Sequence, residues 1–206
     1  MLEYKSIEAL AGAASAGRKI SEVVLADQAE QLGITQDELY GRMDARLEVM
    51  EDSVRAGMNP GLRSTSGLTG GDAARMWRYA ESGGICGGFI NRAMARALAV
   101  SENNAAMGRV VAAPTAGSCG ILPGTVVSML AEGRCDRRAA VLSLFTAGAF
   151  GMVIAQNASI AGAEGGCQAE VGSAAAMAAA ALVQMMDGTP EQALDASSIA
   201  LSNLLG

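Results

Sequence analysis

The 206-residue sequence contains no histidine. This absence excludes Ser-His-Asp and Cys-His nucleophile chemistry, zinc sites with imidazole ligands, and a histidine general base supplied by this chain. Any chemistry must therefore use cysteine, carboxylates, hydroxyls, backbone amides or a bound group.

Aromatic and charged residues are also scarce. Aromatic residues make up 3% of the chain and charged residues 17%, whereas 50% of the residues are hydrophobic and 26 are glycine. This composition excludes intrinsic disorder and predicts a core of small side chains. The net charge is −6 and no stretch concentrates Lys or Arg with aromatics, so we expect no nucleic-acid partner.

The four cysteines, Cys86, Cys119, Cys135 and Cys167, form no C-x-x-C pair, which excludes a zinc knuckle and a thioredoxin-like site. The N-terminal M-L-E-Y-K-S-I-E is charged and has no apolar signal region, so we expect a cytoplasmic protein with reduced thiols. The uncharged segment 139–155 is shorter than the roughly 20 residues that a bilayer requires. We expect a buried helix there and no membrane partner.

Helix signals recur along the chain, and sustained alternation of β-branched residues is absent. Ser21 is expected to cap a helix that ends at Gly33, and T-Q-D-E from Thr35 and T-P-E-Q from Thr189 match the capping-box pattern. Further helices are expected over about 72–82, 87–111, 124–132, 137–156, 168–187 and 190–204. The sequence therefore predicts an all-α fold, an Ala/Gly-rich helical bundle with little or no sheet.

Four loops between these helices, at 59–72, 81–88, 112–125 and 157–170, combine Gly with Ser or Thr. Glycine lets a backbone approach a ligand closely, and the free amides of a helix N-terminus attract carboxylate or phosphate. Each loop alone is equally consistent with an ordinary helix connector, but four together indicate a pocket for a small anionic substrate. None matches a Rossmann or P-loop fingerprint.

Two motifs carry a resemblance to a known family: A-P-T-A-G-S-C-G-I-L-P-G-T at 113–125 and N-A-S-I-A-G-A-E-G-G-C-Q-A-E-V-G-S-A at 157–174. The motifs S-G-L-T-G-G-D, N-A-A-M-G and F-T-A-G-A-F-G support it. The chain resembles, from about residue 6 to residue 206, the α chain or catalytic domain of bacterial iron–sulfur-dependent L-serine dehydratases. The resemblance implies deamination of L-serine to pyruvate and ammonia by a [4Fe–4S] cluster acting as a Lewis acid, without pyridoxal phosphate.

The resemblance also implies which cysteine binds the cluster. By the family's motif, Cys167 within G-G-C-Q-A-E is the first cluster thiolate, although a lone cysteine near a helix start is otherwise typical of a small buried hydrophobic residue. In the family, two more cluster cysteines follow N-L-L-G, with which this sequence ends, and the other three cysteines match no ligand position. We expect residues 1–206 to be a single catalytic domain that lacks this C-terminal part, holds no cluster and is inactive alone.

Polar residues are the candidates for binding the substrate and for accepting its proton. We expect the following to face the carboxylate and ammonium of serine, with capping of helix starts as their alternative role: Ser64, Ser66, Thr69, Asn104, Thr115, Ser118 and Asn157. With no histidine present, the candidate bases are Glu102, Glu170 or a residue of a partner domain. Either glutamate can equally make structural hydrogen bonds.

Other functions remain open on the sequence alone. A cluster-dependent cysteine desulfidase or another hydroxy-amino-acid dehydratase has compatible loops, and a non-catalytic helical subunit module is consistent with the missing cysteines. The expected partners are L-serine, a β chain or β domain, and further copies of the chain in a homo-oligomer.

Overall fold

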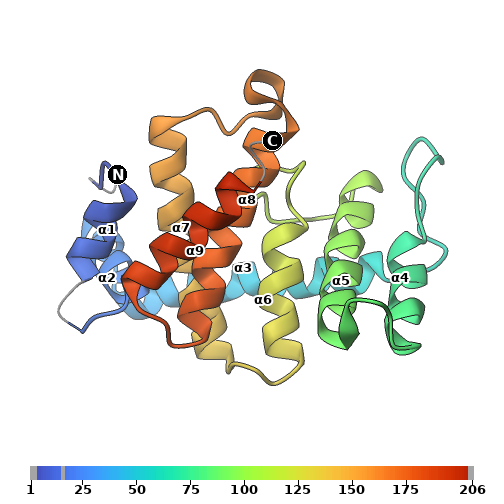
Figure 1. The fold of residues 1–206 in the computed structure, drawn as a ribbon, viewed down its shortest axis with the longest axis horizontal. Coiled ribbons are helices and arrows are strands. Elements are labelled where there is room, and N and C mark those ends of the chain that lie inside the picture. Colours follow the sequence, from blue (N-terminus) through green and yellow to red (C-terminus); the bar gives the residue numbers. More distant parts are fainter. Residues whose placement is uncertain (1–3, 15–16, 204–206) are drawn as a thin grey trace. The chain divides into compact units, whose positions relative to one another are not determined.

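The structure, a computed structural model, describes residues 4–14 and 17–203. These residues form nine α-helices and no strand (Figure 1). The prediction of an all-α fold is therefore confirmed.

The chain divides into two compact units, residues 1–45 with 135–206 and residues 46–134. Helix α3 (Gln36–Gly57) begins in the first unit and ends in the second. We expect residues 1–206 to act as a single catalytic domain. This division does not test how the two units act in catalysis, so the expectation stays a prediction.

Helix α7 lies at the centre of the first unit. The helices of this unit, besides the start of α3, are α1 (Ile7–Ala14), α2 (Ile20–Leu32), α7 (Arg137–Asn157), α8 (Gly162–Met185) and α9 (Pro190–Ser202). Helix α7 contacts α2 and α8, and α9 packs on α8. By length and composition α7 and α8 are both apolar enough to cross a membrane, but 61% of the apolar window of α7 is buried within the protein. This burial is what a core helix requires.

Local signals set several helix ends. Gly33 ends α2 in the left-handed conformation (φ 64°), and Thr35 Oγ1 accepts the Glu38 N–H at 3.1 Å. Thr189 and Gln192 complete a reciprocal capping box at the start of α9. The predictions at Gly33 and Thr189 are confirmed, and of the box predicted at Thr35 the hydroxyl contact is confirmed.

The predicted cap at Ser21 is wrong. Lys19 precedes the first residue of α2, and Ser21 is fully buried inside the helix. The Glu22 carboxylate accepts the Lys19 N–H at 3.0 Å, so this interaction, rather than the serine hydroxyl, starts the helix.

Helix α5 organises the second unit. With the end of α3, this unit contains α4 (Asp72–Glu81), α5 (Gly87–Ala105) and α6 (Ile121–Ala131), and α5 contacts both α4 and α6. Small residues permit close crossings: a Cβ atom on Gly57 of α3 would lie 1.8 Å from the Ala99 carbonyl oxygen of α5. Only glycine fits at such a distance.

Helix α5 is shorter than the predicted helix over 87–111. Asn103 Nδ2 donates to the Arg109 carbonyl at 3.0 Å, and the Gly108 N–H donates to the Asn103 carbonyl at 2.7 Å. Met107, which lies between Asn103 and Gly108, has a positive φ of 62°. This turn ends the helix at Ala105, and the chain continues as a loop until Ile121.

Candidate functional site

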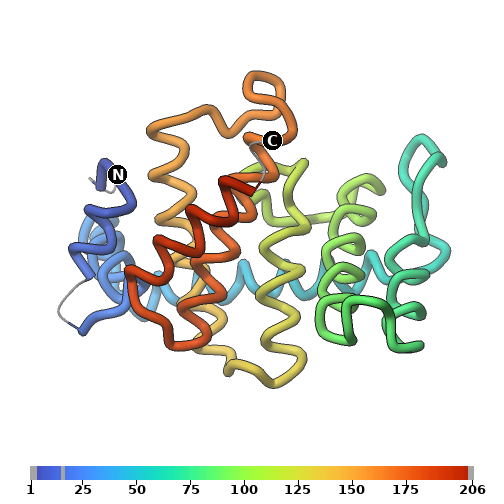
Figure 2. The backbone as a smooth tube through the Cα atoms, in the orientation of Figure 1, coloured from blue at the N-terminus to red at the C-terminus, as the bar shows by residue number. Residues whose placement is uncertain are grey.

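The C-terminal end of α5 holds the Ser/Thr-rich loop that precedes α4. The Glu102 carboxylate accepts the backbone N–H groups of Gly71 at 2.9 Å, Asp72 at 2.6 Å and Ala73 at 3.2 Å. The Thr65 N–H donates to the Ala105 carbonyl at 3.1 Å. The loop that joins α3 to α4 thus projects from this unit (Figure 2), and α5 fixes its base.

Hydroxyl groups close this loop on itself. Ser64 Oγ accepts the Thr69 N–H at 3.2 Å, and the Ser64 N–H donates to the Thr69 carbonyl at 2.9 Å. The hydroxyls of Ser64 and Ser66 lie 3.1 Å apart, and Ser66 and Thr69 are exposed. The three predicted substrate residues of this loop are therefore brought together.

The second loop, between α5 and α6, is attached to the same end of α5. Asn104 Nδ2 donates to the Ala116 carbonyl at 3.1 Å, and the hydroxyls of Thr115 and Ser118 lie 3.1 Å apart. Ser118 and Cys119 are buried, and burial raises the pKa of the Cys119 thiol. Five of the seven predicted substrate residues thus belong to the two loops anchored on the last turn of α5, and Asn104 lies in that turn.

Glu102 makes structural hydrogen bonds, one of the two roles that the sequence left open. Its side chain is buried and binds the N-terminal end of α4, where the unpaired amides and the helix dipole favour a carboxylate. Its role as a base stays a prediction, and its observed contacts position the 59–71 loop.

Cys167, Glu170 and Asn157 belong to the first unit. Helix α8 contains a break at Gly166 (φ 76°, ψ 176°), so a helical turn precedes the break where a loop was predicted, and exposed Cys167 directly follows it. Glu170 is half-buried, and a Cβ atom on Gly162 would lie 2.6 Å from its Oε2. Cys167 and Glu170 are three residues apart, which places them on one face of the helix.

Asn157 ends α7 with contacts to the backbone. Its Nδ2 donates to the Val153 carbonyl at 2.8 Å and to the Lys5 carbonyl at 3.1 Å. The side chain therefore joins the end of α7 to the segment before α1, and its predicted contact with substrate stays a prediction.

The described residues do not fit a complete metal cluster. Across 4–14 and 17–203 no group of three or more His, Cys, Asp or Glu side chains is arranged to hold a metal ion. The Cys135 thiol lies 3.7 Å from Met185 Sδ, and its pKa is raised by burial and by Asp136. Cys167 offers one exposed thiol, and a cubane cluster requires further ligands.

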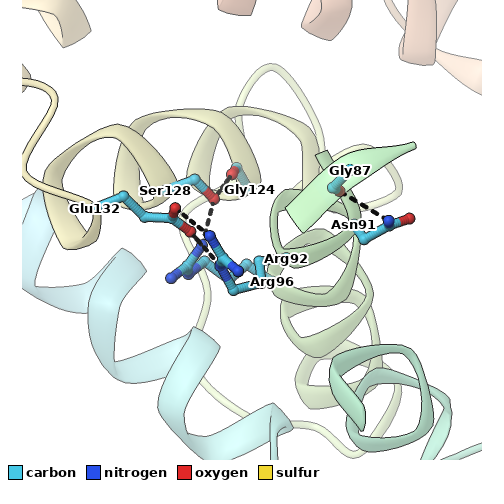
Figure 3. A network of polar contacts seen from close by, with 7 residues as sticks. All are labelled: Gly87, Asn91, Arg92, Arg96, Gly124, Ser128 and Glu132. Carbon is cyan, nitrogen blue, oxygen red and sulfur yellow. Dashed lines mark hydrogen bonds and ion pairs between the residues drawn. The ribbon is translucent and has the colours of Figure 1, made fainter. Parts of the chain in front are cut away.

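Sequence reasoning missed a polar cluster between α5 and α6 (Figure 3). Arg92 binds Glu132 through two hydrogen bonds of 2.6 and 2.5 Å, and Arg96 Nη1 donates to Ser128 at 3.0 Å and to Glu132 at 3.3 Å. The hydrogen bonds from Arg92, with weaker help from Arg96, lower the pKa of Glu132 to about 2 against the opposing effect of burial. Arg92 and Arg96 are four residues apart, and so are Ser128 and Glu132, so each pair lies on one side of its segment. This spacing was the signal that the sequence offered, because the two predicted helices were expected to be neighbours.

Comparison of the sequence with known proteins assigns the chain to a family. Residues 15–206 match the family described as serine dehydratase alpha chain. The chain is 49% identical over 188 residues to the probable L-serine dehydratase, alpha chain, of Bacillus subtilis, covering 91% of this chain and 62% of the relative. It is 44% identical over 191 residues to the L-serine dehydratase, alpha chain, of Peptoniphilus asaccharolyticus, covering 92% and 65%.

A third relative covers less of the chain. The L-serine dehydratase of Streptomyces coelicolor is 50% identical over 111 residues, which is 53% of this chain and 24% of the relative. The chain therefore spans less than two thirds of the length of these relatives.

Proposed function

Because the chain belongs to the serine dehydratase alpha chain family, we propose that it forms part of an enzyme that converts L-serine to pyruvate and ammonia. The observation that carries this proposal is the match of residues 15–206 to the family. The two hydroxyl-rich loops on the end of α5 support it, because they offer polar groups suited to a small zwitterion.

In this reaction serine loses its α proton and its β-hydroxyl as water. The resulting 2-aminoacrylate tautomerises to the imine, which water hydrolyses to pyruvate and ammonia. The chain must therefore hold the carboxylate and ammonium of serine and accept a proton from Cα. We assign the charged groups to Ser64, Ser66 and Thr69, and the contacts that gather these residues in one loop support this assignment.

Glu102 and Glu170 both stay candidates for accepting this proton, and their surroundings differ. Three backbone amides occupy the Glu102 carboxylate, and moving a proton to it would break the contacts that fix the loop. Glu170 shares a helix face with Cys167 in the first unit.

We propose that Cys167 supplies one thiolate of a [4Fe–4S] cluster whose remaining ligands come from outside the described residues. The exposed thiol beside the bare backbone of Gly166 supports this role, because a bulky inorganic group requires such room. Since the described residues do not complete the site, the steps above use only groups of this chain.

The names of the relatives support one of the proposed partners, a beta chain. We propose a separate beta chain, since two relatives are named alpha chains, and a cytoplasmic homo-oligomer. The proposed reaction uses no pyridoxal phosphate, because we assign its chemistry to the described polar groups and the proposed cluster.

The test uses the complete enzyme, with residues 1–206 joined to the part of the Bacillus subtilis relative that they do not match, and its beta chain. After anaerobic loading with iron and sulfide, we expect L-serine to give equal amounts of pyruvate and ammonia. Faster release of sulfide from L-cysteine would identify a desulfidase instead. A fully loaded enzyme that turns over neither amino acid would identify a non-catalytic module.

A further inference from the structure

An open cavity of about 410 Å³ lies between α3, α4 and α5 in the second unit. Its walls are largely apolar and include Val54, Met58, Ala74 and the ring of Trp77. This volume falls in the range of small-molecule sites, which combine apolar walls with a few polar groups. None of the predicted substrate or cluster residues lines it.

Two guanidinium groups, those of Arg78 and Arg96, complete the wall. Arg96 is 7% exposed, lies 5.1 Å from the centre of the Trp77 ring, and uses only Nη1 in its hydrogen bonds. Within the described part of the chain, Nε and Nη2 of Arg96 donate to no acceptor, and Arg78 has no ion pair. These donors of Arg96 are not fully buried, so they are accessible from solvent.

Arg96 is only weakly paired, because its carboxylate partner is engaged mainly by Arg92. Glu132 is bound through both oxygens by Arg92, and its contact with Arg96 is a single longer one of 3.3 Å (Figure 3). Glu81, which does not line the cavity, accepts the Trp77 indole N–H at 3.1 Å. Arg78 and Arg96 are the charged residues among those that line the cavity, and no carboxylate is among them.

We propose that this cavity binds a small carboxylate with an apolar aryl or alkyl body. The carboxylate pairs with the free donors of Arg96 and with Arg78, and the body packs against Trp77 and Met58. Charge-assisted bonds to a partly buried guanidinium select for an anion, and the apolar walls select against L-serine, whose side chain is polar. This site does not depend on the dehydratase activity proposed above.

Trp77 is the only tryptophan of the chain, so its fluorescence reports directly on the cavity. We expect 3-phenylpropionate to change the fluorescence of the 206-residue protein in a saturable way. The neutral 3-phenylpropionamide has the same body without the charge, and we expect it to bind at least about tenfold more weakly.

Arg78→Gln removes one of the two guanidinium groups at an exposed position, and we expect it to weaken 3-phenylpropionate binding about tenfold. Arg75→Gln is the matched control, because Arg75 lies on the same helix, pairs with Asp72 and does not line the cavity. Far-ultraviolet circular dichroism checks that both variants are folded. Equal binding of acid and amide, equal weakening by both variants, or no saturation would each overturn the proposal.

Discussion

Glu102 shows how one side chain can organise a loop. Its carboxylate accepts three N–H groups that lie 29 to 31 residues earlier in the chain. No local pattern points to these partners, because they meet only when α4 packs on α5. From the sequence, Glu102 was a candidate base or a structural hydrogen-bonding residue, and the structure shows that it positions the 59–71 loop.

Glu102→Gln tests this positioning role. The amide retains one acceptor oxygen but loses the negative charge and places an NH₂ group against backbone donors. We expect the free energy of unfolding to fall by about 1–3 kcal/mol, as measured by urea denaturation. Unchanged stability would show that the three bonds contribute nothing to the fold.

Glu132 makes a prediction about pH. Its pKa is held at about 2, below the ordinary value of 4.5, so its charged form is stabilised in the folded protein. The stability that it contributes is fully present above pH 4.5 and is lost as the pH falls from 4.5 towards 2. We expect the wild-type protein to lose more stability over this interval than Glu132→Gln does, in urea denaturation at each pH. Parallel pH profiles for the two proteins would contradict the ion pair.

At the scale of the helix, close packing depends on glycine. A Cβ atom on Gly57 would overlap the Ala99 carbonyl oxygen, whereas one on Gly41 in the same helix has nothing within 4 Å. Gly57 and Gly41 therefore form a matched pair within α3.

We expect Gly57→Ala to lower the free energy of unfolding by about 1–3 kcal/mol or more, because the crossing of α3 and α5 must open. Gly41→Ala should raise it by about 0.5–1 kcal/mol, because alanine is the better helix former. Thermal unfolding followed by circular dichroism measures both changes. A similar change in the two variants would show that backbone propensity, not the crossing, decides the effect of Gly57.

Helix ends show what could be predicted from sequence and what could not. Gly33, Thr35 and Thr189 act through neighbours within four residues, and their roles were predicted correctly. The end of α5 and the break at Gly166 depend on turns whose geometry is set by packing, and the predicted boundaries there were displaced.

The candidate site divides in the same way. Its hydroxyl-bearing residues were recognised from loop composition and family motifs. Their pairings, such as Asn104 with the Ala116 carbonyl, arise from the return of the chain after α5. The cluster of Arg92 and Glu132 was missed because its members lie on different helices, 40 residues apart.

At the scale of the whole protein, the family assignment rests on residues 15–206, and the chain spans 62% and 65% of two alpha-chain relatives. The proposed function requires Cys167 to be a functional thiolate of the complete enzyme. Cys135 provides the matched control, because its half-buried thiol lies against Met185 in the same unit and matches no ligand position.

The most direct test compares Cys167→Ser with Cys135→Ser in the complete enzyme, assembled with its beta chain and loaded anaerobically with iron and sulfide. Bound iron and pyruvate formation from L-serine are measured on the same samples. A serine alkoxide is a poor substitute for a thiolate on iron, so we expect Cys167→Ser to lose both and Cys135→Ser to keep both near the wild-type level. Full iron content and full pyruvate formation in Cys167→Ser would contradict the account.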